Sequence, residues 1–248
     1  MKVSIITATY NSAKTISDCI ASVRGQTYPD IEHIIIDGAS DDNTIELIKS
    51  QPNLVKQLIS EPDKGIYDAM NKGIQMATGE VIAILNSDDF YIDNCVIQSV
   101  IDVFKKSHAD CVYADLFYVD KYNTDKIVRR WITKEYKYGS FKKGWHPAHP
   151  SFFVRKEVYY KYGAFDLSFN LAADFEFMLR MLEKNRIHSI YFPSSLVKMR
   201  LGGATNKNFL NIYNQNLECI KAFQKNGLEA GPLYSFYRLL PKLAQYFK

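Results

Sequence analysis

Two adjacent carboxylates, Asp88 and Asp89, follow the apolar run Val81–Leu85 in the segment Asn86-Ser87-Asp88-Asp89. Neighbouring carboxylates repel each other, and a divalent cation would relieve that repulsion. Mg²⁺ and Mn²⁺ prefer oxygen ligands, and a metal held by one or two carboxylates keeps positions open for phosphate oxygens. A helix cap or a turn is the alternative, because Asp and Asn favour both.

Asp37 ends a second apolar run, residues 34–36, and precedes Gly38. A carboxylate at this place can accept hydrogen bonds from a nucleobase N–H or a ribose hydroxyl. Capping is the alternative, but residues 40–42 already supply caps for the next helix. This surplus favours a ligand-binding role for Asp37.

Asp174 and a histidine-rich loop are further candidates for chemistry. Asp174 lies where a helix is expected to begin, and it can be either an N-cap or a general base; position alone does not distinguish the two. The segment 145–150 contains Trp145, His146 and His149, and its two prolines stiffen it. Histidine there can act as a base, a metal ligand or a phosphate donor, or it can be structural.

The first half of the sequence predicts a scaffold that brings these groups together. Strands are expected at 3–7, 33–36, 54–59 and 81–85, and they alternate with helical stretches at 12–24, 43–49 and 66–77. Strands that are apolar on both faces and separated by helices indicate an α/β fold: a Rossmann-like, mostly parallel sheet with helices on both faces.

Ligands bind such sheets at the carboxyl ends of the strands, and polar segments stand at those ends here. They are Thr9-Tyr10-Asn11, residues 37–42, Pro62-Asp63-Lys64-Gly65 and residues 86–89.

The second half is less regular. Strands are expected at 110–119, 127–131, 151–154 and 187–192, and helices at 175–183, 209–224 and 233–247, the last interrupted by Pro241. We expect residues 1–206 to form a catalytic domain. Residues 207–248 are expected to form a C-terminal helical extension packed on it or on a membrane surface.

Composition excludes several classes of protein. The chain has 248 residues, 47% of them hydrophobic and 23% charged, which is ordinary for a globular protein. The net charge of +4 comes without the basic run that a nucleic-acid partner would require. Four dispersed cysteines, no cationic leader and no apolar run near ~20 residues predict a cytoplasmic protein, with peripheral attachment to the inner face of the plasma membrane left open.

The residues resemble the inverting family 2 glycosyltransferases that build bacterial surface polysaccharides, whose catalytic domain has the nucleotide-sugar-binding GT-A fold. The resemblance covers residues 3 to about 205 and is most specific from 3 to 90. It rests on the opening strand and loop with Thr7, Thr9, Tyr10 and Asn11, on residues 34–44 with Asp37, on Asn71-Lys72-Gly73, on Asn86-Ser87-Asp88 in the place of the D-x-D metal motif, and on Asp174 in the place of the catalytic base.

The resemblance implies a specific reaction. A nucleotide diphosphate sugar, with UDP favoured, would stack its base near Tyr10 and hydrogen-bond Asp37, while Mn²⁺ or Mg²⁺ on Asp88, aided by Asp89, bridges the diphosphate. Asp174 would deprotonate a hydroxyl of a saccharide or lipid-linked saccharide acceptor. Trp145, His146 and His149 are expected near the acceptor or the phosphates.

Two departures from the family pattern affect this assignment. Asn86 replaces the first Asp of the metal motif, so that the metal depends mainly on Asp88. Met70 stands where the family often has Arg before the helix asparagine, so that Lys64 or Arg200 would contact the donor phosphates instead. Arg200 precedes paired glycines, Gly202 and Gly203, which are typical of a mobile loop.

Two other classes of function remain as alternatives. A nucleotidyltransferase would usually need a glycine-rich phosphate loop after the first strand, and residues 8–12 contain no glycine. A dinucleotide oxidoreductase fails for the same reason. A non-catalytic nucleotide-sugar-binding module would need Tyr10 and Asp37 but neither Asp88 nor Asp174.

The end of the chain, residues 232–248, combines leucines and aromatic residues with Arg238, Lys242 and Lys248 and has no acid. This composition is typical of a helix that lies on an anionic membrane surface. A helix that covers the catalytic domain or a partner subunit is the more common alternative.

Overall fold

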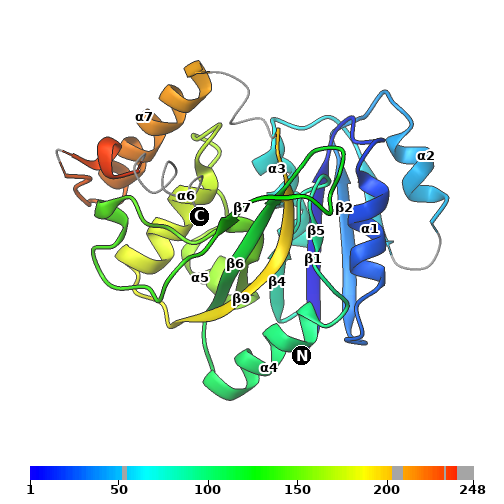
Figure 1. Ribbon diagram of the computed structural model, residues 1–248, viewed down its shortest axis with the longest axis horizontal. Coiled ribbons are helices and arrows are strands. Elements are labelled where there is room, and N and C mark those ends of the chain that lie inside the picture. The colour runs from blue at the N-terminus through cyan, green and yellow to red at the C-terminus, as the bar shows by residue number, and fades with distance from the viewer. Residues whose placement is uncertain (52–54, 203–208, 232, 239–248) are drawn as a thin grey trace.

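The computed structural model describes residues 1–51, 55–202, 209–231 and 233–238. Within these residues one sheet has the strand order β3-β2-β1-β4-β8-β6-β9-β5, and β7 pairs with β6 beside this path (Figure 1). Its strands are β1 (Val3–Thr9), β2 (Ile31–Asp37), β3 (Val55–Ser60), β4 (Val81–Ile84), β5 (Phe90–Tyr91), β6 (Cys111–Val119), β7 (Ile127–Trp131), β8 (Phe152–Arg155) and β9 (Ser189–Arg200).

The helices cover both faces of this sheet. They are α1 (Ile16–Arg24), α2 (Thr44–Lys49), α3 (Ile66–Met76), α4 (Val96–Ser107), α5 (Lys156–Tyr162), α6 (Ala173–Leu179) with a π-helical end at Arg180–Lys184, and α7 (Phe209–Lys225); Phe141–Lys143 and His149–Ser151 are short 3₁₀ turns. In Figure 1, α1 and α2 lie on one side of the molecule, and α6 and α7 lie on the other.

The four strands β1 to β4 are all parallel, as predicted, with β1 between β2 and β4. Alternate side chains enter opposite cores: Ile6 faces the core shared with α3 and α6, and Ile5 faces the core shared with α1 and α4. A methyl group on Gly73 would collide with Ile6, so glycine at this position of α3 allows the helix to pack closely on β1. The predicted α/β fold with helices on both faces is confirmed.

The second half of the sheet is mixed. β8 is antiparallel to both β4 and β6, whereas β6 and β9 are parallel. The prediction ended the last strand at Phe192, but β9 continues to Arg200 through register shifts around Asp115. The elements β5, α4 and α5 were not predicted, although Val96, Val100 and Phe104 give α4 a buried helical face.

The C-terminal part packs on the catalytic core. Phe223 of α7 and Tyr234 both contact the Phe175 ring, with centroids 6.0 and 6.3 Å away. Residues 234–238 are helical, and the rest of the predicted last helix, residues 239–247, lies outside the described residues. The predicted boundary between residues 206 and 207 also lies outside the described residues. The division into a catalytic domain and a C-terminal extension therefore stays a prediction. No described helix is long and apolar enough to cross a bilayer.

Candidate active site

The polar loops that follow β1, β2 and β4 contact one another, as the strand order requires. The Asn11 backbone N–H donates to Ser40 Oγ (2.8 Å), and Asn11 Oδ1 accepts from the Asp41 N–H (3.0 Å). The Ser12 and Ser87 hydroxyls are 2.8 Å apart. The sequence-predicted edge of the sheet is therefore one continuous polar surface.

Tyr10, Gly38 and Asp63 form an open cradle at this edge. The Tyr10 side chain is 61% exposed, and the Gly65 N–H fixes Asp63 Oδ1 at 2.8 Å. A methyl group on Gly38 would lie 2.6 Å from Asp63 Oδ2 and 3.5 Å from Tyr10 Cδ2. Bare backbone between an aromatic ring and a carboxylate acceptor suits a planar base that carries an N–H donor.

Asp37 supports this cradle from below. Its carboxylate is fully buried and accepts hydrogen bonds from the Ser40 backbone N–H (2.9 Å), the Ser40 hydroxyl and the Ser60 hydroxyl (2.7 Å). Asp42, not Asp37, accepts the Thr44 N–H at the start of α2, as the sequence argument expected, but Asp37 has a structural use of its own because it closes the turn at Ser40. Asp63 is the carboxylate that borders the open cradle.

The two threonines of β1 lie behind the loop. Thr7 is fully buried, and its hydroxyl lies 3.0 Å from His33 Nε2 and 3.6 Å from Cys19 Sγ. The structure therefore uses the Thr7 side chain inside the core rather than toward the expected donor. Thr9, at the strand end, is 4% exposed, and its hydroxyl has no hydrogen-bond partner within the described structure.

The loop after β4 brings the carboxylates of Asp88 and Asp89 together. Asp89 is fully buried, and Asn86 Nδ2 donates to its Oδ2 at 3.1 Å. Burial raises the pKa of Asp89 well above its usual value, and the charge of Asp88 raises it further. Burial also raises the pKa of Asp88.

The same loop fits a hard divalent cation. Oδ1 of Asn86 and Oδ1 of Asp89 are buried and have no hydrogen-bond partner in the described part of the chain. Asp88 of the same loop adds a further carboxylate, and oxygen atoms of these kinds are the ligands that Mg²⁺ and Mn²⁺ prefer. Asn86 and Asp88 are partly exposed, whereas Asp89 is buried. The described residues include no group of three or more His, Cys, Asp or Glu side chains that could hold a metal ion.

Arg200, expected at the donor phosphates, holds the β4 loop instead. Its guanidinium is 6% exposed, pairs with Asp18, and donates from Nη1 to the Asp88 carbonyl oxygen at 2.7 Å. Arg200 Cζ also lies 4.9 Å from the centre of the Phe90 ring. Lys64, in contrast, is exposed beside Asp63 and stays the candidate for contact with the phosphates.

Asn71, expected to bind the donor, joins two distant segments. Its Nδ2 donates to the Phe165 carbonyl oxygen (2.8 Å), and its Oδ1 accepts from the Phe165 N–H (3.0 Å). Both ends of the amide are therefore satisfied by backbone. Asn71 fixes the loop before α6 onto α3, which places Asp174 relative to the parallel strands.

Asp174 is the centre of a hydrogen-bonded chain that crosses the molecule. Its Oδ1 accepts from the Tyr67 hydroxyl at 3.0 Å, and its Oδ2 lies 3.2 Å from His149 Nδ1. His149 Nε2 lies 3.2 Å from Asn86 Nδ2, which also reaches Asp89. The chain joins the base candidate to the metal-motif loop.

The capping alternative for Asp174 finds no support. Ala172 is the N-cap of α6, and the backbone N–H groups of residues 170–172 donate to the Glu218 carboxylate. The Asp174 carboxylate bonds side chains of other segments and is 20% exposed. The carboxylate is therefore partly accessible to solvent.

The hydrogen-bond partners assign the proton on His149. Because Asn86 Nδ2 can only donate, Nε2 of His149 is the acceptor, and Nδ1 carries the hydrogen that points to Asp174. His149 therefore bridges Asn86 and Asp174 and donates to the carboxylate.

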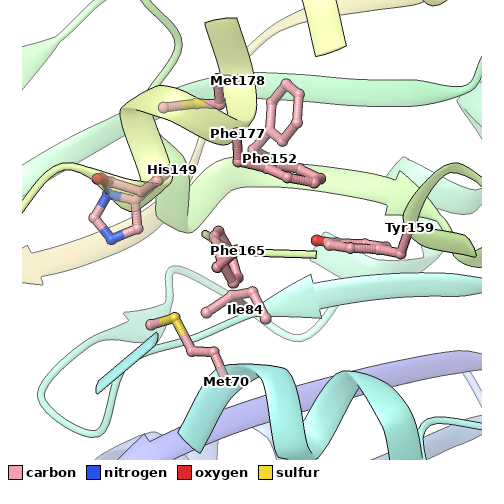
Figure 2. A pocket seen from close by; sticks show the side chains of 9 residues that line it. Met70, Ile84, His149, Phe152, Tyr159, Phe165, Phe177 and Met178 are labelled. Carbon is pink, nitrogen blue, oxygen red and sulfur yellow. Dashed lines mark ion pairs between the residues drawn. The ribbon is translucent and has the colours of Figure 1, made fainter. Parts of the chain in front are cut away.

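An apolar cavity of about 20 Å³ borders Asp174 and His149. Figure 2 shows Met70 and Ile84 on one side of it and Phe177 and Met178 on the other. This volume holds about one water molecule.

Trp145 and His146 belong to the aromatic core that anchors the histidine loop. The Trp145 ring packs 5.6 Å from Phe141 and 6.0 Å from Tyr113, and the His146 ring packs 5.1 Å from Trp131. Of the three expected contact residues in this loop, His149 is the one that reaches Asp174. Sequence reasoning missed Tyr67, whose only signal was an aromatic residue in the first turn of α3.

Comparison with known proteins agrees with this arrangement. The sequence model of the family Glycosyl transferase family 2 matches residues 4–163. The chain is 28% identical over 215 residues to the PGL/p-HBAD biosynthesis glycosyltransferase of Mycobacterium bovis (strain BCG / Pasteur 1173P2), covering 82% of this chain and 78% of that protein. It is 36% identical to an uncharacterized glycosyltransferase of Mycobacterium tuberculosis (strain ATCC 25618 / H37Rv), over 72% of this chain and 68% of that protein.

Solved structures share the fold. S. aureus TarS 1–349 in complex with UDP-GlcNAc aligns with a TM-score of 0.70 at 16% identity, over 99% of this chain and 78% of that chain. This chain spans 44% of a longer TarS structure. The mannosyltransferase PcManGT from Pyrobaculum calidifontis, in complex with GDP-Man and Mn²⁺, aligns with a TM-score of 0.65 at 19% identity, over 98% of this chain and 70% of that chain. The fold is thus that of the GT-A glycosyltransferases, and the chain belongs to glycosyl transferase family 2.

Proposed function

We propose that this enzyme transfers a sugar from a nucleoside diphosphate donor to an acceptor hydroxyl with inversion of configuration. The observation that carries the proposal is the chain of contacts from Tyr67 through Asp174 and His149 to Asn86. This chain of contacts connects the partly exposed carboxylate of Asp174 to the loop after β4, whose oxygen atoms suit a cation bound to a diphosphate. Structural neighbours hold UDP, UDP-GlcNAc and GDP-Man, which supports a nucleotide-sugar donor, and we favour UDP.

The donor would lie across the edge of β1 to β4. Tyr10 stacks on the base, Asp63 and the turn closed by Asp37 supply acceptors for its N–H groups, and Lys64 faces the phosphates. Asp88, with Asn86 Oδ1 and Asp89 Oδ1, would hold Mg²⁺ or Mn²⁺, which neutralises charge that develops on the diphosphate leaving group.

The acceptor would meet Asp174. This carboxylate accepts the proton of the attacking hydroxyl, and one displacement at the anomeric carbon inverts it, so no carboxylate nucleophile is required. Burial raises the pKa of Tyr67 well above its usual value, and the charge of Asp174 raises it further. Tyr67 therefore stays a neutral donor that orients Asp174 without competing for the proton.

We favour a role in building surface saccharides, and one relative supports a biosynthetic role. The similarity to a glycosyltransferase named for PGL/p-HBAD biosynthesis favours a saccharide or lipid-linked acceptor. A nucleotidyltransferase or a module that only binds nucleotide sugars would not need a carboxylate held as Asp174 is held. A cytoplasmic location on the inner face of the plasma membrane would suit such an acceptor.

The test begins with donor binding. Thermal unfolding is measured with a panel of UDP- and GDP-sugars and Mn²⁺, since a ligand raises stability in proportion to its occupancy. The stabilising donor is then mixed with candidate acceptors, and nucleoside diphosphate release and the anomeric configuration of the product are measured. Release of pyrophosphate, or stabilisation without any turnover, would reject the proposal in favour of one of the two alternatives.

A further inference from the structure

Positive charge concentrates around one loop. Lys134, Lys137, Lys142 and Lys143 are exposed on the segment 134–143, and Lys184 and Arg186 are exposed at the end of the π-helical turn. We call these six residues the basic patch. Glu135 is the one exposed acid in these two segments, because Glu183 is buried.

The two segments are packed together. Glu183 accepts hydrogen bonds from the Gly139 N–H (2.9 Å) and the Phe141 N–H (3.2 Å). Arg186 Cζ lies 4.4 Å from the centre of the Tyr138 ring, which is 63% exposed. The basic patch is therefore a fixed surface that also presents an aromatic ring.

An exposed apolar group lies next to it. A methyl group on Gly144 would lie 2.6 Å from Arg238 Cα and 2.7 Å from the Tyr237 carbonyl carbon, so the helical residues 234–238 touch the end of the loop. In Figure 1 this red segment and the green loop lie on the same side of the molecule.

The spacing of this short helix directs its apolar side chains outward. Tyr234 and Arg238, four residues apart, are 1% and 4% exposed. Leu233, Phe236 and Tyr237 are 54%, 58% and 42% exposed, and we call these three residues the apolar patch. Apolar and aromatic side chains beside lysines are the composition of a surface that meets lipid headgroups and the upper acyl region.

We propose that the basic patch and the apolar patch together dock this enzyme on an anionic lipid bilayer. Charge complementarity selects this occupant: a second copy of the chain would bring like charges together, whereas anionic headgroups attract them. Single exposed apolar side chains are common on soluble proteins. Three of them beside six cations form a larger surface, and exposing its apolar part to water is unfavourable.

The docked orientation has a consequence for the active site. The loop 134–143 continues into the segment that carries His149 to Asp174. The basic patch lies at the Glu183 end of the helix whose first turn carries Asp174, so a bilayer under the patch would lie against the half of the molecule that contains Asp174. This consequence rests on the proposed function, whereas bilayer binding itself does not.

The test is co-sedimentation of the full chain with vesicles. Phosphatidylcholine vesicles with about one-third phosphatidylglycerol are compared with pure phosphatidylcholine vesicles at low and high salt. We expect binding to the anionic vesicles only, lost at high salt. The triple variant Lys137→Glu/Lys142→Glu/Lys143→Glu should bind at least ~10-fold more weakly, and Phe236→Ser should weaken binding by several-fold.

A matched triple variant controls for net charge. Lys49→Glu/Lys105→Glu/Lys106→Glu makes the same change at exposed positions on α2 and α4. We expect it to keep at least half of the wild-type vesicle binding. Donor stabilisation in thermal unfolding reports that each variant is folded, and its retention in both triples separates a docking failure from failure of the proposed reaction.

Three outcomes would overturn the proposal. The first is an equal loss of vesicle binding in both triple variants, and the second is that the folded wild type does not sediment with anionic vesicles. The third is that a nucleic-acid competitor abolishes sedimentation with the vesicles whereas added soluble anionic lipid does not.

Discussion

The two halves of this enzyme, which we propose bind the donor (the donor half) and the acceptor (the acceptor half), obtain their chemistry in different ways. In the donor half, β1 to β4 are parallel, and each places its own short polar loop at one edge. In the acceptor half, the sheet is mixed, and Asp174 is fixed by Tyr67, 107 residues away, and by His149. The first arrangement is local and readable from motifs; the second exists only after the chain has folded.

The largest expected effect breaks the donor half. Asp88→Ala removes the partly exposed carboxylate of the metal-motif loop, and transfer should become undetectable, since nothing then neutralises the leaving diphosphate. Excess chelator should do the same to the wild type, and Mn²⁺ should restore it. The measurement is nucleoside diphosphate release. Full activity in excess chelator would reject the metal role.

The second effect breaks the acceptor half alone. Asp174→Asn keeps the shape of the side chain and one acceptor oxygen but removes the basic oxygen. We expect kcat to fall at least ~10²-fold, while donor stabilisation in thermal unfolding stays as in the wild type. A variant with normal turnover would show that Asp174 has a structural role only.

This difference also explains what the sequence could predict. The polar ends of the first four strands were predicted because alternation of strands and helices forces parallel neighbours. Thr7, Asn71 and Arg200 were assigned to the donor from position, but their side chains bond the core, Phe165 and the β4 loop. A motif shows where a residue lies along the chain, whereas tertiary contacts decide what its polar atoms bond.

The same reasoning explains the histidine loop. Prolines predicted a rigid segment, but sequence could not show that His146 packs beside Trp131 while His149 reaches Asp174. Tyr67 gave no polar signal because a tyrosine in the first turn of an amphipathic helix is ordinarily apolar packing. Long-range pairs of this kind have no period or spacing to detect.

A third, smaller effect tests the bridge between the halves. An amide side chain can imitate one histidine nitrogen at a time. His149→Asn should preserve a donor near the Nδ1 position that serves Asp174, whereas His149→Gln should preserve only the contact near Nε2 that serves Asn86. We expect kcat to fall ~10-fold in the Gln variant and less in the Asn variant, because only the Asn variant keeps a hydrogen bond to Asp174. The KM for the nucleotide sugar should change little in both variants.

The ratio of sugar transfer to donor hydrolysis by water provides a second readout for this pair. A mispositioned Asp174 should lower transfer to the acceptor more than hydrolysis. Equal loss in the two variants with an unchanged ratio would mean that His149 only supports the fold.

A fourth effect is confined to the base cradle. Gly38→Ala would put a methyl group 2.6 Å from Asp63 Oδ2 and push the carboxylate away from Tyr10. The donor KM should rise ~10-fold with kcat nearly unchanged, because lost base contacts are uniform binding. Steady-state kinetics measure both constants. A fall in kcat at an unchanged KM for the nucleotide sugar would place the effect in the acceptor half. The proposed separation between the two halves would then be wrong at Gly38.

The smallest effect concerns acid and the core of the donor half. Burial lowers the pKa of His33 to about 4, below its usual value near 6.5. The folded state then binds fewer protons than the unfolded state between these values, so stability is full above about pH 6.5 and falls as the pH drops toward 4. This loss is at most about 3 kcal/mol.

The nearby carboxylate of Glu32 acts in a lower window, which makes the His33 effect separable. Burial alone would raise the pKa of Glu32, but hydrogen bonds from Lys2, Ser4 and Thr78 lower it to about 2, so its contribution is lost only below about pH 4.5. Urea unfolding of the wild type and of His33→Gln at pH 7, 5.5 and 4.5 is the measurement. The Gln variant should be less stable at pH 7, because Thr7 loses its imidazole partner, and it should lose less stability than the wild type on acidification. If both proteins lose the same free energy of unfolding between pH 7 and 4.5, the acid sensitivity arises from groups other than His33.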